Sequence, residues 1–374
     1  MSETLDLDTV IGNPATRIVV ACGAGGVGKT TMAAALALRA AEQGRKVVVL
    51  TIDPARRLAQ SLGLTELDNT PRVVADVDVT TGGRLDAMML DMKRTFDEVV
   101  IAHATPDKAA QILANPFYMA LSSSFAGTQE YMAMEKLGQL HTQAQRTGEW
   151  DLIVVDTPPS RSALDFLDAP ERLASLLEGR FLRLLLAPAR GPFRLMSAGV
   201  NLAMSVMNKV LGAQVLTDVQ TFVAAFDTLF GGFRDRAEQT VALLRESHTA
   251  FLVVAAPQND ALREASYFIQ RLREEHMPLA GVVLNRVTTT EISDLSAERA
   301  LAGAEDLEKQ GRSDLTAGVL RLHADRMRQV VSDHKRADRF RRGHRAIPTV
   351  SVPALADDVH DLDGLRAIGT LLAG

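Results

Sequence analysis

The chain has 374 residues, of which 47% are hydrophobic, so it can bury one large core or two modest ones. A formal net charge of −5 gives no overall attraction to nucleic acid or to an anionic membrane, which leaves only local patches for such contacts. The single cysteine, Cys22, excludes a disulfide or a thiolate metal cluster within one chain and fits a reducing, cytoplasmic compartment.

The first residues are polar and acidic, without the basic start and apolar stretch of a signal peptide. No uncharged apolar run reaches the length of a membrane span. We therefore expect a soluble chain without a targeting segment. The first strong pattern is a β-branched run at residues 17–22, which predicts a buried strand, and an Ala/Leu-rich stretch at 32–39 predicts the helix that follows.

Between that strand and helix, residues 23–31 have the composition and spacing of a phosphate-binding loop. Glycines let backbone N–H groups close around phosphate oxygens at a helix N-terminus, where the partial positive charge favours an anion. We expect Lys29 to reach the β- and γ-phosphates, the Thr30 hydroxyl to bind Mg²⁺ and Thr31 to touch the α-phosphate. A glycine-rich turn that binds no nucleotide is the alternative. The residues predicted to contact the nucleotide here are Gly23, Gly25, Gly26, Val27, Gly28, Lys29, Thr30 and Thr31.

Two later apolar runs each end in an acid. Residues 47–52 lead into Asp53, and residues 150–155 lead into Asp156. Ligands of open α/β sheets collect at the carboxyl ends of strands, so both carboxylates are candidates for the site. In phosphate-loop proteins an acid placed like Asp156 completes the Mg²⁺ site. Ordinary strand-end capping is the alternative for each acid.

Short strands are also predicted at residues 72–79 and 84–90, and again at 250–255 and 279–286, with a helix at 261–275 between the last two. Strands that alternate with helices imply a parallel sheet with right-handed crossovers. We predict an α/β fold with a doubly wound, mostly parallel sheet, a phosphate loop and an inserted helical subdomain.

Helical periodicity replaces the strand pattern in two long stretches, which we expect to form the helical subdomain. The whole chain is then a single domain with a nucleotide-binding core. The expected subdomain segments are 92–147 and 171–246, and the expected core segments within residues 1–374 are 16–91, 148–170 and 247–374.

Three stretches outside these motifs are less specific. Residues 196–207 carry methionines at helical spacing, which suits a groove for an apolar client, although buried packing explains the same pattern. Residues 291–318 are polar and weakly periodic. At residues 321–345 the basic side chains outnumber the acidic ones nine to three, which indicates a solvated helix or a contact with a partner or phospholipid.

Four further motifs, taken with the phosphate loop, resemble one family. Residues 51–55, 155–160, 283–286 and 352–356 are similar in order and kind to the arsenite-transport and tail-anchored-protein-targeting ATPases. The resemblance spans residues 16–370. It implies a dimeric NTPase with a deviant phosphate loop, and the sequence is similar to an actinobacterial branch encoded as paired, non-identical subunits.

The resemblance implies an ATPase that uses ATP and Mg²⁺, with Lys29 and Asp53 as its catalytic residues. Asp53 would be the switch residue that orients or activates the attacking water, and Asp156 would hold the water shell of the magnesium. Asn285 would hydrogen-bond adenine, with a plain turn residue as the alternative, and Pro353 would flank the base. The nucleotide state would control binding of a hydrophobic client or a membrane-protein partner.

The chain departs from the family pattern at the second loop position, where Ala24 replaces a lysine that reaches across the dimer to the partner's phosphates. A cation missing from a developing phosphoryl charge lowers the rate by several powers of ten. We therefore expect a heterodimer with a paralogous subunit that keeps the lysine, with a homodimer as the other arrangement. The alternative functions are a nucleotide-binding, non-hydrolysing regulatory subunit and an energising subunit of an anion transporter.

Two further departures concern metal binding and the switch. Cys22 alone permits neither the family's Cys-x-x-Cys zinc site nor thiolate binding of a metalloid, so we expect no zinc. Residues 158–162 replace the family's Ala-Pro-Thr-Gly-His, so the coupling of the switch is expected to differ. We expect no nucleic-acid partner and a cytoplasmic protein that reaches a membrane only through a partner.

Overall fold

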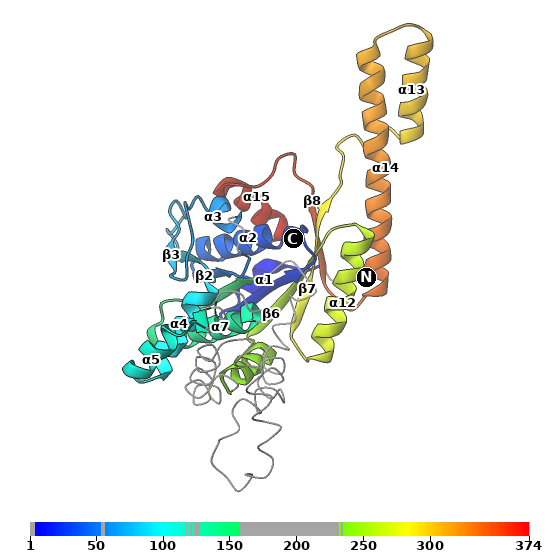
Figure 1. The fold of residues 1–374 in the computed structure, drawn as a ribbon. Helices are drawn as coiled ribbons and strands as arrows, with labels where there is room; N and C mark the ends of the chain where they lie inside the picture. Colours follow the sequence, from blue (N-terminus) through cyan, green and yellow to red (C-terminus); the bar gives the residue numbers. More distant parts are fainter. Residues whose placement is uncertain are drawn as a thin grey trace, which may run out of the picture. The chain divides into compact units, whose positions relative to one another are not determined.

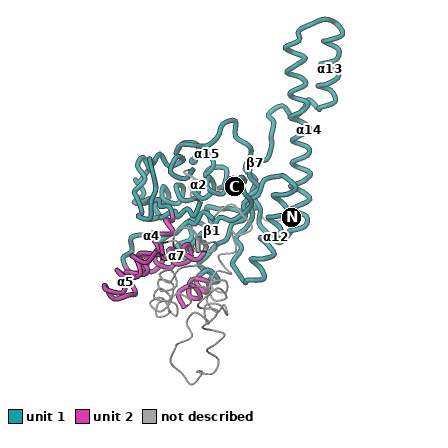
Figure 2. Tube along the Cα trace, viewed as in Figure 1, with its two compact units in different colours: residues 1–89, 147–163, 244–374 teal, residues 90–146, 164–243 magenta. Residues whose placement is uncertain are grey.

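The computed structural model describes residues 4–53, 57–116, 118–119, 122, 128–157, 232 and 235–373. The chain forms two compact units, each assembled from separate segments (Figure 2). Unit 1 comprises residues 1–89, 147–163 and 244–374, and unit 2 comprises residues 90–146 and 164–243. The methionine-bearing stretch at 196–207 lies outside the described residues.

Unit 1 is built on an eight-stranded sheet in the order β3-β4-β2-β5-β1-β6-β7-β8 (Figure 1). Every neighbouring pair is parallel except β3 with β4. The predicted α/β class and mostly parallel sheet are therefore confirmed. The strands are β1 (Ile18–Gly23), β2 (Lys46–Thr51), β3 (Arg72–Val73), β4 (Arg84–Met89), β5 (Leu152–Asp156), β6 (Thr249–Ala255), β7 (Leu279–Val287) and β8 (Thr349–Pro353).

Helices cover both faces of this sheet, because its crossovers run in opposite directions from the middle. The chain passes from β1 through α2 toward one edge and from β6 through α12 toward the other. Right-handed crossovers then place α2 and α12 on opposite faces, and the reversal beside β1 marks the usual ligand position of such folds. The helices of unit 1 are α1 (Leu7–Gly12), α2 (Lys29–Glu42), α3 (Arg57–Ser61), α12 (Asn259–Glu274), α13 (Ala297–Lys309), α14 (Asp314–Gly343) and α15 (Leu362–Leu372).

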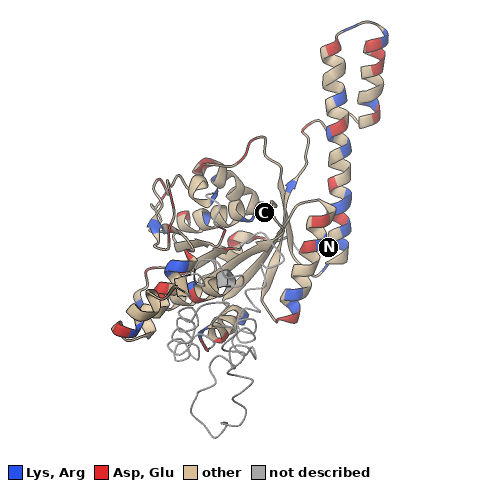
Figure 3. Ribbon diagram, viewed as in Figure 1, with Lys and Arg blue, Asp and Glu red and all other residues tan. Residues whose placement is uncertain are grey.

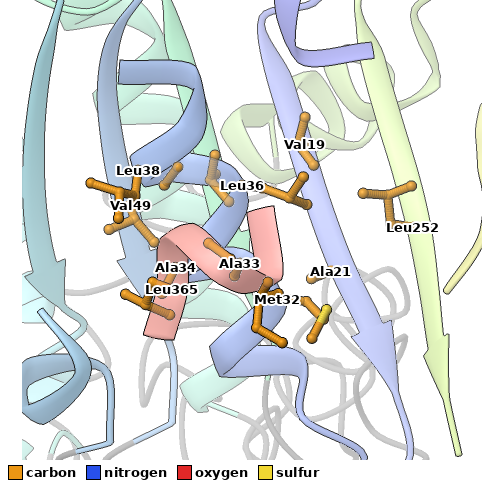
Figure 4. Close-up of a cluster of buried hydrophobic side chains, with 14 of the residues drawn as sticks. Val19, Ala21, Met32, Ala33, Ala34, Leu36, Leu38, Val49, Leu252 and Leu365 are labelled. Atoms are coloured by element: carbon orange, nitrogen blue, oxygen red, sulfur yellow. The ribbon is translucent and has the colours of Figure 1, made fainter. Parts of the chain in front are cut away.

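The main core lies between α2 and the sheet (Figure 4). Leu36 of α2 packs toward the β1 side of this core, where Val19 lies, and Leu365 of α15 joins the same buried cluster. Small residues such as Ala33 leave room for α15 and the strands to approach α2 closely. Burying one such leucine contributes about 1.5–3 kcal/mol, so α2 is held firmly on both sides. The loop that precedes α2 is therefore joined to two well-packed elements.

The strand predicted at residues 72–79 is wrong beyond Val73, where β3 ends. Asp76 adopts a left-handed backbone conformation with φ of 59°, which is incompatible with an extended strand. The Asp78 carboxylate then accepts a hydrogen bond from the Thr80 N–H, which is a turn interaction. Local side-chain turns thus override the strand propensity of the valines.

The polar residues 291–318 and the basic run that follows form a helical hairpin of α13 and α14, which extends away from the sheet (Figure 1). Ser296 caps α13 by accepting from the Arg299 N–H, and Ala300 and Ala324 meet in a small core of their own between the two helices. Charges of both signs line α14 (Figure 3). Two arginines pair with exposed aspartates three residues earlier in the helix, Arg328 with Asp325 and Arg341 with Asp338, which favours the solvated-helix interpretation. Arg336 pairs in the same way with Asp333, which is buried.

Unit 2 is helical where it is described. Its described helices include α4 (Met92–His103), α5 (Pro106–Leu113) and α7 (Thr128–Thr147, whose last residue falls in unit 1). The Tyr118 hydroxyl donates to the Asp97 carboxylate at 2.6 Å, and Arg236 pairs with the buried Glu135 at 3.0 Å. Within the residues described in both units, no helix is long and apolar enough to cross a membrane.

Candidate functional site

The glycine-rich loop connects the end of β1 to the start of α2, as predicted. Gly28 is the N-cap of α2, has a left-handed φ of 95° and offers no capping side chain. A Cβ at this position would collide with the amide nitrogen of Asn285, so only glycine fits. No capping side chain therefore competes for the first N–H groups of α2, and an anion can bind there.

Lys29 is the first residue of α2, and its side chain turns back into the loop. Its Nζ donates to the backbone carbonyls of Gly23 at 3.0 Å and Ala24 at 2.8 Å. Burial lowers the pKa of this ammonium, while the nearby Asp156 carboxylate acts in the opposite direction. A buried cation whose hydrogen-bond partners among the described residues are carbonyls is ready to receive an anionic ligand, which would offset its desolvation.

Asp156 ends β5 and is fully buried. Its Oδ2 accepts from the hydroxyls of Thr30 at 2.8 Å and Thr51 at 2.9 Å, whereas its buried Oδ1 has no hydrogen-bond partner among the described residues. Burial raises the pKa of this carboxyl to about 6, although both hydroxyls and Lys29 oppose the shift. An unpartnered carboxylate oxygen beside a threonine hydroxyl is a donor set that suits a hard cation.

These residues fit magnesium better than zinc. In the described part of the chain, no group of three or more His, Cys, Asp or Glu side chains could hold a metal ion. Mg²⁺ rarely needs such a cage, because it binds through one or two protein ligands, several waters and the phosphates of a nucleotide. Thr30 and Asp156 bring one hydroxyl and one carboxylate together at this position.

A pocket of about 750 Å³ opens beside the loop, within the size range of small-molecule sites. It brings together most of the predicted contact residues, from the loop, the end of β2, the end of β7 and the end of β8. The predicted residues that line it are Gly26, Gly28, Lys29, Thr30, Thr31, Asp53, Asn285 and Pro353. Asp156 and Gly23 do not line the pocket themselves, but each accepts a hydrogen bond from a residue that does: Asp156 from Thr30 and the Gly23 carbonyl from Lys29.

Sequence reasoning missed several residues at this site. Thr51 joins two of the predicted acids, because its hydroxyl donates to Asp156 and its Oγ1 accepts from the Asp53 N–H at 3.2 Å. Arg286 and Arg57 add positive charge to the pocket, and Asp357 and Asp358 add negative charge. Thr51 and Arg286 lie inside the strand-end motifs, so position alone could have identified them. The other three had no signal in the sequence.

Ala24 and Cys22 are both buried near the loop. Ala24 is 7% exposed and belongs to the main core, so this loop position presents no side chain to solvent. Cys22 is a free thiol in the middle of the sheet, and burial raises its pKa to about 12. A protonated, enclosed thiol is a poor nucleophile and a poor metal ligand.

Comparison with known proteins agrees with this geometry. The profile of the family described as anion-transporting ATPase matches residues 16–310. ATPase BagA of Mycobacterium tuberculosis is 23% identical over 368 residues, covering 96% of this chain and 92% of the relative. ATPase GET3B of Arabidopsis thaliana is 24% identical over 319 residues, covering 78% and 70%. A putative arsenical pump-driving ATPase of Aquifex aeolicus is 31% identical over 156 residues, covering 42% and 50%. A phosphate loop, strand-end acids and a family match over most of the chain lead to one conclusion: this protein belongs to the anion-transporting ATPase family.

Proposed function

We propose that this chain is an ATP-binding and ATP-hydrolysing subunit of a dimeric ATPase. The observation that carries the proposal is the meeting of Lys29, Thr30 and Asp156 at the mouth of a glycine loop. That arrangement combines a cation, a hydroxyl and a carboxylate at a helix N-terminus, which is the chemistry a nucleotide with bound Mg²⁺ requires. Membership of an ATPase family supports ATP as the nucleotide.

Each residue has a separate task in this proposal. The loop amides and Lys29 bind the phosphates, and Asn285 and Pro353, which line the same pocket, bind the base. Thr30 and Asp156 hold Mg²⁺, which when bound neutralises phosphate charge as the terminal phosphoryl group leaves. Each contact places opposite charge or a hydrogen-bond donor where the triphosphate needs it.

Asp53 is proposed to orient or activate the attacking water. It lines the pocket at the end of β2, and its N–H donates to the Thr51 Oγ1. The Thr51 hydroxyl in turn donates to Asp156. A change at the metal carboxylate can therefore pass through one threonine to the backbone of the switch acid, which supports a nucleotide-dependent switch.

The subunit is proposed to work in a heterodimer. Position 24 is alanine in this chain. The family resemblance places a lysine there that contacts the phosphates bound by the partner subunit, so this chain cannot make that contact. A paralogue with lysine at that position would complete the site described here. Ala24 equally supports a second candidate function, a regulatory subunit that holds nucleotide without hydrolysing it and activates its partner.

We also propose that the nucleotide state controls binding of a client or a membrane-protein partner. This part comes from the family resemblance, and the methionine-bearing stretch at 196–207 proposed to contact the client lies outside the described residues. Pull-down with an Asp53→Asn variant held in its ATP state, followed by identification of the bound proteins, tests this part. Enrichment independent of ATP would argue against it.

Equilibrium binding of a fluorescent ATP analogue tests the core of the proposal. The chain should bind ATP with Mg²⁺ more tightly than without it, and Thr30→Val should remove the magnesium effect. The matched control is Thr240→Val, which removes a hydroxyl that donates to a backbone carbonyl in unit 2. Failure of the wild-type chain to bind ATP under any of these conditions would overturn the proposed function.

A further inference from the structure

The end of β7 contacts the phosphate loop through two consecutive side chains. The Asn285 Nδ2 donates to the Val27 carbonyl at 2.8 Å, and the Arg286 Nη1 donates to the Gly26 carbonyl at 2.9 Å. Two adjacent residues thus hold two adjacent carbonyls of the loop, across a sequence separation of about 260 residues.

The backbone and side-chain geometry at this point is specialised. Arg286 has a left-handed φ of 58°, which residues with a Cβ rarely adopt. The Asn285 Oδ1 accepts from the Arg286 N–H at 2.9 Å, which fixes the orientation of the amide. Gly28 is favoured by its left-handed φ of 95°, and a Cβ there would also displace the Asn285 amide. The left-handed Arg286, the oriented Asn285 amide and the glycine at position 28 together indicate a specific contact between β7 and the loop.

Because the peptide group is planar, these two contacts also fix the direction of the loop N–H groups that follow each carbonyl. The described residues contain no cis peptide bonds, and in a trans peptide the C=O and the following N–H point in opposite directions. Holding the carbonyls of Gly26 and Val27 toward β7 therefore turns the N–H groups of Val27 and Gly28 away from β7. Successive N–H groups turned to one side form the concavity that binds anions.

We propose that Asn285 and Arg286 form a clamp that sets the phosphate loop in its anion-binding conformation before the nucleotide arrives. Both are positioning residues, because they act through the loop carbonyls. The clamp rests on the proposed nucleotide function but assigns a further task to Asn285, which the family resemblance connects only with adenine. Its benefit is preorganisation, since a loop that is already ordered loses less entropy on binding.

Tripolyphosphate separates this task from base recognition, because it offers the phosphates of ATP without adenine. Calorimetric titration of the purified chain with magnesium tripolyphosphate should give affinities about tenfold weaker for Asn285→Ala and for Arg286→Gly than for wild type. Arg286→Gly keeps the left-handed backbone without strain, so its thermal unfolding midpoint should not fall and misfolding cannot explain the loss. Arg286→Lys retains a cationic donor and should recover most of the affinity.

Arg326→Ala is the matched control, because the Arg326 Nε donates to the Thr289 carbonyl beyond the end of β7, outside the phosphate loop. It removes the same charge and the same kind of contact, and should leave the affinity within about twofold, inside the spread of surface substitutions. Unchanged tripolyphosphate affinity in either clamp variant, or a loss of the same size in Arg326→Ala, would overturn the clamp. Wild type that binds ATP but not tripolyphosphate would also overturn it. Wild type that binds neither would overturn the proposed function as well.

Discussion

Replacing Asp156 with asparagine should stabilise the metal-free protein while abolishing its ATPase activity. Burial raises the pKa of this carboxyl from 3.8 to about 6. At about 1.36 kcal/mol for each pKa unit, ionising the buried carboxyl at pH 7 costs the folded state about 3 kcal/mol relative to the unfolded chain. Asparagine keeps the shape and an acceptor for Thr30 and Thr51 without this cost, so Asp156→Asn should raise the free energy of unfolding by an amount of that order.

The difference in the free energy of unfolding between Asp156→Asn and wild type should depend on pH, because of the same pKa shift. A raised folded-state pKa means that stability is fully present below pH 3.8 and falls as the pH rises to about 6. The gain from Asp156→Asn should therefore be greatest above pH 6, about half as large at pH 5, and absent below pH 3.8, where both states carry the proton.

Urea unfolding in EDTA, at several pH values from 5 to 8, measures this difference directly. Asp151→Asn is the matched control, because Asp151 lies just before the other end of β5 and pairs with Arg45. That variant should lose stability at every pH. An Asp156→Asn protein that is equally stable or less stable than wild type at pH 7 would refute the reasoning, since burial would then carry no net cost for this carboxylate.

Lys29→Ala should weaken ATP binding at least hundredfold, measured with a fluorescent nucleotide, because the loop loses its buried cation; near-normal affinity would contradict its assignment. Asp53→Asn should bind ATP within about threefold of wild type yet give no phosphate release in the assembly where this site is active, since its proposed role begins only with the attacking water. Normal phosphate release by that variant would remove Asp53 from the mechanism. Burial raises the pKa of the Cys22 thiol to about 12, so a maleimide at pH 8 should not label the folded chain. In urea, the labelling rate should equal the rate of unfolding. Fast labelling of the folded chain would show that the first strand is open to solvent.

The fold and the centre of the site could be predicted because their signals are local. The phosphate loop is specified by spacing over nine consecutive residues, 23–31, and its flanking strand and helix follow from the periodicity of adjacent residues. Asp53 and Asp156 could be found because parallel strands end at one edge of the sheet. The predicted parallel sheet places both acids at this edge, and the pairing of β2 with β5 then brings Asp156 beside Thr51, a contact that the sequence did not indicate.

The rest depends on contacts that no local pattern reveals. The strand expected at 72–79 ends at Val73 because Asp76 adopts a left-handed backbone conformation and the Asp78 side chain makes a turn hydrogen bond that competes with the ladder. The buried cluster of the α13–α14 hairpin consists of three alanines with a few partly buried larger side chains around them, which gives weak periodicity. The orientation of Asn285 toward Val27 follows from how β7 lies beside β6 and, through it, β1.

The central claim, that this chain binds ATP in its own loop but needs a non-identical partner to complete the site, has one direct test. Single-turnover hydrolysis of radiolabelled ATP should be slow for the purified chain alone and at least tenfold faster when a paralogue bearing lysine at the position of Ala24 is added. A loop-lysine variant of the paralogue equivalent to Lys29→Ala should keep this acceleration, because the hydrolysing site is the one on this chain. Rapid hydrolysis by the chain alone, with no acceleration on mixing, would contradict the claim.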